Sequence, residues 1–384
     1  MQNIWTDKKS RQTIIQIIVV IVVLSLLGFF IRNTLNNLEL LGREASYNFL
    51  FSPSNYDINQ HLIDYDSRST HLRATVVGII NTGLVAFFGI VLATLIGFVA
   101  GVSRLSSNFL VNRIAYVFVE FSRNVPILLW ILLWHGMIVH NMPHPKQAIT
   151  AYDFAFLTNR GIYMPKPLLE PAFWGVFIAL LVALAGSYVF YRFAKQKQEL
   201  TGQQYPVYWV NFGLIVTVPL LVFWLLGAPA ELEYPVFKGF NFQGGLVLSP
   251  EFIALLVALG VYTGAFIAEI VRAGILAVSH GQSEAAYALG LKSNLAMRLV
   301  ILPQALRVIV PPMISQYLNL TKNSSLAIAV GYMDIVATIG GISLNQTGRA
   351  LECMSIVLAL YLCISLSISG FMNWYNKRIS LVER

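Results

Sequence analysis

Residues 284–290 read EAAYALG, and residues 300–303 read VILP. This polar, small-residue stretch separates two long apolar segments. Alanine favours helix and glycine commonly ends one, so we expect a short helix that closes at Gly290. Its small side chains would let another protein approach closely. From the residues alone, an ordinary loop between helices is the simpler interpretation, because loops rich in glycine and alanine are common.

The composition places the chain in a membrane. Of its 384 residues, 57% are hydrophobic and 11% are charged, whereas a soluble domain carries about 25% charged residues. The mean hydropathy is +0.67. These values predict an all-α integral membrane protein, a helical bundle in lipid. Cys353 and Cys363 lie in one apolar segment, about 15 Å apart along a helix, so we expect core thiols without a disulfide.

The apolar runs predict about eight transmembrane helices. Seven runs are continuous, at 14–31, 76–102, 112–139, 172–193, 207–227, 252–276 and 353–372. One further stretch is interrupted, because 307–321 is followed by Lys322-Asn323-Ser324-Ser325 and then by 326–342. The first piece would span only about 23 Å, less than a bilayer core of about 30 Å, so we expect a broken or re-entrant helix there.

The distribution of charge predicts the orientation. With both termini inside, the inner segments hold 15 positive and 4 acidic residues, and the outer segments hold 10 positive and 12 acidic residues. Positive residues accumulate on the cytoplasmic side of membrane proteins, so this topology is self-consistent. It places 277–304 inside and the loops 32–72, 140–171 and 228–250 outside. The net charge of +8 then reflects orientation, and we expect no nucleic-acid partner.

Two predicted spans carry a pair of glycines four residues apart. Gly97 and Gly101 lie in 76–102, and Gly260 and Gly264 lie in 252–276. Small residues at this spacing let two helix backbones come close together. Incidental or lipid-facing glycines remain an alternative interpretation.

No pattern for catalysis or metal binding stands out. The sequence contains neither the P-loop pattern GxxxxGK[ST] nor the zinc pattern HExxH. His140 and His144 are four residues apart, but no acidic or cysteine neighbour accompanies them, which favours an interfacial pair over a metal site. We therefore expect that the chain is not an enzyme and holds no metal or nucleotide.

Several motifs, read in order, resemble one transport family. The spacing EAA-x3-G-x9-hydrophobic-x-LP resembles the cytoplasmic loop of type I ABC import permeases, with Val300 where isoleucine is usual. Further segments are similar to the polar amino-acid branch, the histidine/glutamine permease type: 120–126, 269–275, 281–282, 302–307, 311–312 and 322–326. The resemblance covers roughly 70–139 and 250–376. The larger layout resembles the general amino-acid permease subfamily.

This resemblance implies an organisation around a five-helix permease core, at about 72–139 and 250–376. An N-terminal helix and external loop would occupy 1–71, and a cytoplasmic tail would occupy 377–384. The segment 140–250 would be an insertion of two helices and external loops. The second part of the core, 251–376, would contain the cytoplasmic coupling loop 277–304.

The resemblance also implies a function and partners. The chain would be the transmembrane subunit of an ATP-driven importer for L-amino acids in the bacterial inner membrane, forming half of the translocation pathway. It would hold no cofactor, because ATP and Mg²⁺ would bind a separate ATPase subunit. The other partners would be a second, related permease subunit and an external amino-acid-binding protein that docks on the outer loops.

The family's coupling role transfers to specific positions of the inner loop. They are Gly281, Gln282, Glu284, Ala285, Ala286, Gly290 and Pro303. We expect Glu284 to make the polar anchoring contact with the ATPase. Ala285, Ala286 and Gly290 would permit close packing.

Charged residues inside membrane spans are costly and are functional candidates by default. Glu120 and Arg123 are three residues apart, as are Glu269 and Arg272, so each pair either lines the inner pore or neutralises itself. A pore with both signs of charge suits a zwitterionic amino acid. At the helix break, polar side chains either meet the substrate carboxylate or cap the broken helix. The full candidate set for the substrate pathway is Glu120, Arg123, Asn124, Glu269, Arg272, Lys322, Asn323 and Ser324.

A secondary transporter or channel driven by an ion gradient is the competing function. Broken helices and buried charges suit it, but it would not need the 284–290 stretch. The sequence leaves open which amino acids are carried and whether the second permease subunit is identical or related.

Overall fold

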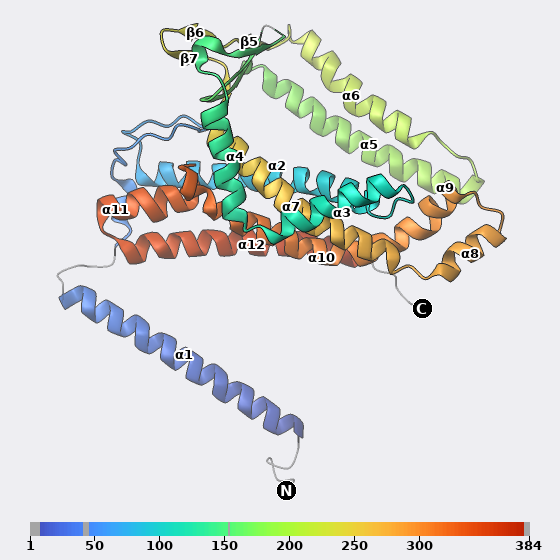
Figure 1. Ribbon diagram of the computed structural model, residues 1–384, viewed down its shortest axis with the longest axis horizontal. Helices are drawn as coiled ribbons and strands as arrows, with labels where there is room; N and C mark the ends of the chain where they lie inside the picture. Colours follow the sequence, from blue (N-terminus) through green and yellow to red (C-terminus); the bar gives the residue numbers. More distant parts are fainter. Residues whose placement is uncertain (1–7, 41–45, 153, 380–384) are drawn as a thin grey trace. The chain divides into compact units, whose positions relative to one another are not determined.

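A computed structural model describes residues 8–40, 46–152 and 154–379 (Figure 1). It divides into two compact units. The first joins the described residues up to Arg123 with those from Thr263 onward, and the second runs from Asn124 to Tyr262. The predicted insertion 140–250 falls inside the second unit. Residues 1–7 and 380–384 of the predicted terminal segments, and 41–45 of the first external loop, lie outside the described residues.

Helices make up most of the chain. The α-helices are α1 (Lys8–Leu40), α2 (His71–Ser103), α3 (Phe109–Asn124), α4 (Ile127–Asn141), α5 (Phe173–Thr201), α6 (Val207–Leu225), α7 (Pro250–Leu276), α8 (His280–Ala288), α9 (Ser293–Ala296), α10 (Leu302–Asn323), α11 (Leu344–Thr347) and α12 (Ala350–Ile379). Short 3-10 or π-helical turns are η1 (Asn48–Phe51), η2 (Pro145–Gln147), η3 (Met297–Ile301), η4 (Ser324–Val330) and η5 (Val336–Ser343). The strands are β1 (Ile149–Ala151), β2 (Ala155–Thr158), β3 (Gly161–Met164), β4 (Lys166–Leu169), β5 (Ala230–Glu233), β6 (Val236–Lys238), β7 (Asn241–Gln243) and β8 (Leu246–Leu248).

The predicted fold class, an all-α membrane protein with about eight spans, is confirmed. Within the described residues, 7 helices are long and apolar enough to cross a membrane, and 8 spans result if α3 and α4 count as one. The spans comprise α1, α2, α5, α6, α7, the continuous segment Ser293–Val330, and α12. None of the apolar window of α1 is buried by the described residues, and a helix that is hydrophobic all round is typical of a membrane span.

The prediction of one continuous span at 112–139 was wrong. The residues form two helices, since α3 ends at Asn124 and α4 begins at Ile127. Pro126 lies in the gap. Proline has no amide hydrogen to donate, and it disfavours the helical conformation of the residue before it, here Val125. The sequence is apolar on both sides of Pro126 and so suggests one span, but the proline itself indicates the break between α3 and α4.

The glycine pair Gly97 and Gly101 lies at a close helix crossing, which was one of the two interpretations that the sequence left open. A Cβ atom at Gly101 would lie 2.7 Å from the carbonyl oxygen of Ala268 in α7. In return, a Cβ at Gly264 of α7 would lie 2.9 Å from the side chain of Ile96. Side chains at these positions would push α2 and this part of α7 apart, so glycine is what permits their contact.

The predicted interruption after residue 321 is present, but the break lies later than expected. The α-helix α10 passes through Pro311 and Pro312 and ends at Asn323, and η4 continues it to Val330. The chain turns at Gly331, whose φ is +82°. This left-handed conformation is accessible to glycine at little cost. The polar run at 322–325 therefore marks the change from α-helix to 3-10 helix, and the helix ends at Gly331.

A buried carboxyl group holds the chain just after this break. Asp334 has 0% exposure. Its Oδ1 accepts a hydrogen bond from the amide of Ala337 at 2.8 Å, and its Oδ2 accepts one from the Tyr361 hydroxyl at 3.3 Å. The side chain of Asn81 in α2 donates to the carbonyl of Met333 at 2.9 Å. The segment after the break thus obtains hydrogen-bond partners from α2, at its backbone, and from α12, at the Asp334 side chain.

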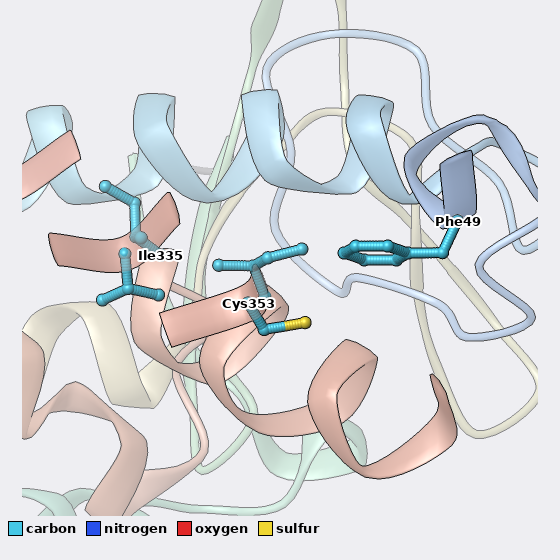
Figure 2. Packing of buried hydrophobic residues seen from close by; sticks show 5 residues of the cluster. Phe49, Ile335 and Cys353 are labelled. Atoms are coloured by element: carbon cyan, nitrogen blue, oxygen red, sulfur yellow. The ribbon is translucent and has the colours of Figure 1, made fainter. Parts of the chain in front are cut away.

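An apolar cluster packs beside this polar group in the first unit. Its buried members come from η1, from η5 with the residue just before it, and from α12, and are Phe49, Ile335, Ile339, Cys353 and Val357 (Figure 2). The Cys353 thiol lies among these side chains, and neither cysteine forms a disulfide. Cys353 is therefore a core thiol, as the sequence predicted. Cys363 is exposed, which differs from that prediction.

The second unit contains sheets that the sequence did not predict. Strands β1, β2, β3 and β8 form one antiparallel sheet in that order, and β4–β5 and β6–β7 form two smaller ones. Because β3 pairs with β8 and β4 with β5, the predicted loops 140–171 and 228–250 are joined across the α5–α6 hairpin (Figure 1). Phe156 and Phe242 stack with ring centroids 4.4 Å apart. These loops therefore form one small β-structure.

We expect Gly101→Ala to destabilise the protein, because the added Cβ would clash with the Ala268 carbonyl at 2.7 Å. Overpacking of this kind costs about 1–3 kcal/mol. Gly83→Ala is the matched control in the same helix, since a Cβ there meets no atom of the described residues within 4 Å. Thermal unfolding of the detergent-solubilised protein measures both variants, and equal melting temperatures for the two would contradict the close crossing.

Asp334→Ala should also lower the melting temperature. It removes the acceptor for the Ala337 amide and the Tyr361 hydroxyl, and an unpaired buried polar group costs about 1–3 kcal/mol. Asp334→Asn retains an acceptor oxygen and should cost less. If Asn proves as damaging as Ala in the same thermal assay, the hydrogen bonds are not what makes this side chain important.

Candidate functional site

The EAA stretch forms a short helix, as predicted, and begins earlier than expected. It lies in α8, which runs from His280 to Ala288. Gly290 has a φ of +76°. Its amide donates to the carbonyl of Tyr287 at 2.9 Å, and the Leu291 amide donates to that of Ala286 at 3.1 Å. This pair of bonds is a Schellman motif, which explains why a glycine ends the helix.

One side of α8 is buried by the chain itself. Ala286 is only 2% exposed. The side-chain amide of Gln304, in the first turn of α10, donates to Oε1 of Gln282 at 3.1 Å. Pro303 also lies in that first turn, where α10 continues from the π-helical turn η3. The small size of Ala286 therefore serves packing within the loop, and α8 is tied to α10.

The opposite side of α8 is open. Glu284 keeps 69% of its side-chain surface exposed, with its Oε1 3.0 Å from Nδ1 of His280. Gly281, Ala285 and Gly290 are exposed as well. So are two large side chains, Tyr287 at 51% and Leu289 at 81%, which the motif had not singled out. Their signal in the sequence is the presence of large apolar residues on a loop otherwise made of small and polar ones.

The structure brings the two predicted ion pairs together. In α3, Arg123 Nη1 lies 4.0 Å from Oε1 of Glu120. In α7, Arg272 Nε donates to Oε1 of Glu269 at 3.1 Å. Arg104, which directly follows α2, forms an ion pair with Glu269 and lies 4.0 Å from Glu120. We call these five residues the charge network.

Arg104 is the member that sequence reasoning missed. It is one of the 15 positive residues of the predicted inner segments, which entered the prediction only through the orientation. Its side chain is 10% exposed, and its guanidinium lies 5.2 Å from the ring centroid of Tyr116. A signal was present, because Arg104 is three residues after Gly101 and so follows directly on the glycine crossing.

The remaining pathway candidates lie at helix ends. Asn124 is the last residue of α3. Lys322, Asn323 and Ser324 lie at the junction of α10 and η4. Ser324 is 1% exposed, and its hydroxyl donates to the Thr321 carbonyl at 2.7 Å. This local bond favours the structural interpretation of Ser324, while Lys322 stays exposed.

Comparison with known proteins places the chain among transporters. A family profile described as "Binding-protein-dependent transport system inner membrane component" matches residues 203–381. The "Putative amino-acid ABC transporter permease protein YhdX" of Escherichia coli (strain K12) is 46% identical, over 99% of this chain and 97% of that protein. The "General L-amino acid transport system permease protein AapQ" of Rhizobium johnstonii is 45% identical, over 98% of this chain and 94% of that protein.

A third relative extends the agreement. The "Glutamate/glutamine/aspartate/asparagine transport system permease protein BztB" of Rhodobacter capsulatus is 46% identical, over 98% of this chain and 96% of that protein. The similarity thus includes α1 and the insertion, which the resemblance of motifs did not cover. It also decides between the two functions that the sequence left open. The chain belongs to the family of amino-acid ABC transporter permeases.

Proposed function

We propose that this permease subunit carries L-amino acids and receives the motion of its ATPase through the exposed side of α8. As an ABC importer permease, the chain works in a bacterial inner membrane with a separate ATPase subunit and a binding protein. The proposal on substrate rests on the names of the relatives, which include general L-amino acid transport and transport of glutamate, glutamine, aspartate and asparagine.

The coupling surface consists of Gly281, Gln282, Glu284, Ala285 and Gly290. The observation that carries its role is the two-sided character of α8. Its buried side, at Ala286, is packed against the chain, while the side that bears Glu284 is open. The bond from Gln304 to Gln282 ties it to α10. A push on such a helix would move α10 with it, which is what coupling requires.

The partners follow from the same proposal. ATP and Mg²⁺ would bind the ATPase subunit, and the loop 277–304 would face the cytoplasm with both termini. This orientation is supported by the excess of positive residues on that side. A second permease subunit, related to this one, would complete the pathway. The β-structure formed by 140–171 and 228–250 would offer the binding protein part of its docking surface, since binding residues commonly lie on loops that a scaffold positions.

The charge network suits a zwitterionic cargo. An amino acid carries an ammonium and a carboxylate, and the network presents both signs of charge from α3 and α7. Its four predicted members are between 28% and 38% exposed at the side chain. We therefore place Glu120, Arg123, Glu269 and Arg272 along the pathway for the substrate.

Two substitutions that change the charge of the coupling surface test its coupling role. Glu284→Lys and Gly290→Asp should lower ATP-driven uptake by about tenfold or more, because a loss of 1.4 kcal/mol in subunit contact changes an equilibrium tenfold. Gly290→Asp also introduces a side chain at a φ of +76°. Uptake into proteoliposomes, with vanadate as inhibitor of the ATPase, is the measurement.

The matched control for charge reversal is Glu199→Lys. Glu199 lies in α5 on the same expected side of the membrane and pairs only weakly with Lys195, at 4.0 Å. It should leave uptake unchanged. Uptake driven by an ion gradient without ATP would overturn the proposal, as would full coupling in both α8 variants.

Glu120→Gln tests the pathway role of the charge network. It removes one negative charge at nearly constant shape, so we expect substrate-stimulated ATPase activity to change while the complex still assembles. Size-exclusion chromatography reports assembly, and the ATPase assay reports stimulation. Loss of the whole complex would instead identify Glu120 as a structural ion-pair partner.

A further inference from the structure

Arg123 has bonding capacity that its surroundings in the protein leave unused. Its Nε is buried, and no residue that the structure describes offers it a hydrogen-bond acceptor. Its Nη1 lies 4.0 Å from Glu120 Oε1, the outer limit of an ion pair. The guanidinium lies 5.0 Å from the ring centroid of Phe266 in α7. A buried charged donor without an acceptor is unfavourable, so this side chain is arranged for a partner that the chain itself does not supply.

The charge balance indicates the sign of that partner. The network contains three guanidinium groups, on Arg104, Arg123 and Arg272, and two carboxylates, on Glu120 and Glu269. One positive charge is left over. Arg104 and Arg272 both pair closely with Glu269. The surplus therefore falls on Arg123, and an anion would neutralise it.

Apart from the buried Nε of Arg123, the described residues leave both side chains of the Arg123–Glu120 pair partly open. The side chains of Arg123 and Glu120 are 32% and 38% exposed. They lie three residues apart on α3, so they share one face of the helix. The pair thus presents a positive and a negative group side by side. The flat guanidinium matches a carboxylate in shape, because two of its N–H groups can donate in parallel.

We propose that Arg123 binds the α-carboxylate of the amino acid during translocation, with Glu120 receiving its ammonium group. This inference rests on the proposed transport of L-amino acids. The network also leaves Glu120 with a cationic neighbour when the amino acid is released. When the ammonium leaves Glu120, that carboxylate still has Arg104 at 4.0 Å. The negative charge on α3 therefore has a cationic neighbour whether or not the cargo is bound.

The test measures amino-acid binding to the purified permease–ATPase complex. The external binding protein is left out, so that the measured affinity is that of the permease alone. The probes are a radiolabelled L-amino acid that the wild-type transporter imports and its α-carboxamide, which lacks the negative charge. Arg123→Ala should weaken binding of the amino acid by about tenfold or more, as expected for loss of a charge-assisted bond. The same variant should bind the carboxamide as well as the wild type does, because the carboxamide has no negative charge for Arg123 to bind. Arg123→Lys should fall between, because it keeps the charge without the planar fork.

Arg113→Lys is the matched control on the same helix. Arg113 lies outside the network, 5.3 Å from the ring centroid of Tyr116, and its substitution should leave affinity unchanged. Basal ATPase activity and elution volume show that each complex is assembled. If Arg123→Ala does not assemble, the comparison of Arg123→Lys with Arg113→Lys carries the test.

Three outcomes would overturn the assignment. They are wild-type affinity in the Arg123 variants, equal losses for the acid and the carboxamide, and an effect of Arg123 that appears only in vesicles containing phosphatidylglycerol. The last would identify a lipid phosphate as the anion. Each leaves ATP-driven uptake by the wild type intact, whereas failure of the proposed function would appear as absence of that uptake.

Discussion

The close approach of α2 and the later part of α7 is the constraint on which the inner charges depend. Gly97 and Gly101 remove the side chains that would separate the two backbones, and Gly264 does the same from the α7 side. Arg104 follows the crossing and so reaches Glu269. With a wider crossing, Arg104 would lose this close partner, and a charge left unpaired within a membrane protein is strongly unfavourable.

Much of this arrangement could be predicted because its signals are local. Hydrophobic length predicts the spans, glycine spacing predicts the crossing, and the alanines with Gly290 predict a short helix. The spacing of Glu269 and Arg272 predicts their ion pair. Arg104 differs, because its partner Glu269 is 165 residues away along the chain. Ala286 differs too, since only the folded loop shows which alanine of the motif is turned inward.

The short strands of the insertion and the burial of Asp334 could not be predicted from the sequence. The strands of the insertion have three or four residues each, too few for a pattern of alternation to emerge. Two of the pairings, β3 with β8 and β4 with β5, cross the α5–α6 hairpin, which is a tertiary effect. Asp334 is one of the 12 acidic residues that the predicted topology assigns to the outer segments. Its burial is tolerable only because Ala337 and Tyr361 donate to it, and neither bond can be read from spacing.

The register of β4 and β5 has a consequence for how such chains can change length. Leu169 stands opposite Ala230, and the amide of Glu170 extends the ladder to the carbonyl of Pro229 at 3.2 Å. The α5–α6 hairpin therefore leaves and re-enters the β-structure at a single point. The two ends of this segment adjoin, so a tight turn could replace the whole segment without altering the register of the strands on either side. Membrane-spanning helices can in this way be gained or lost in pairs, which preserves the orientation of everything that follows.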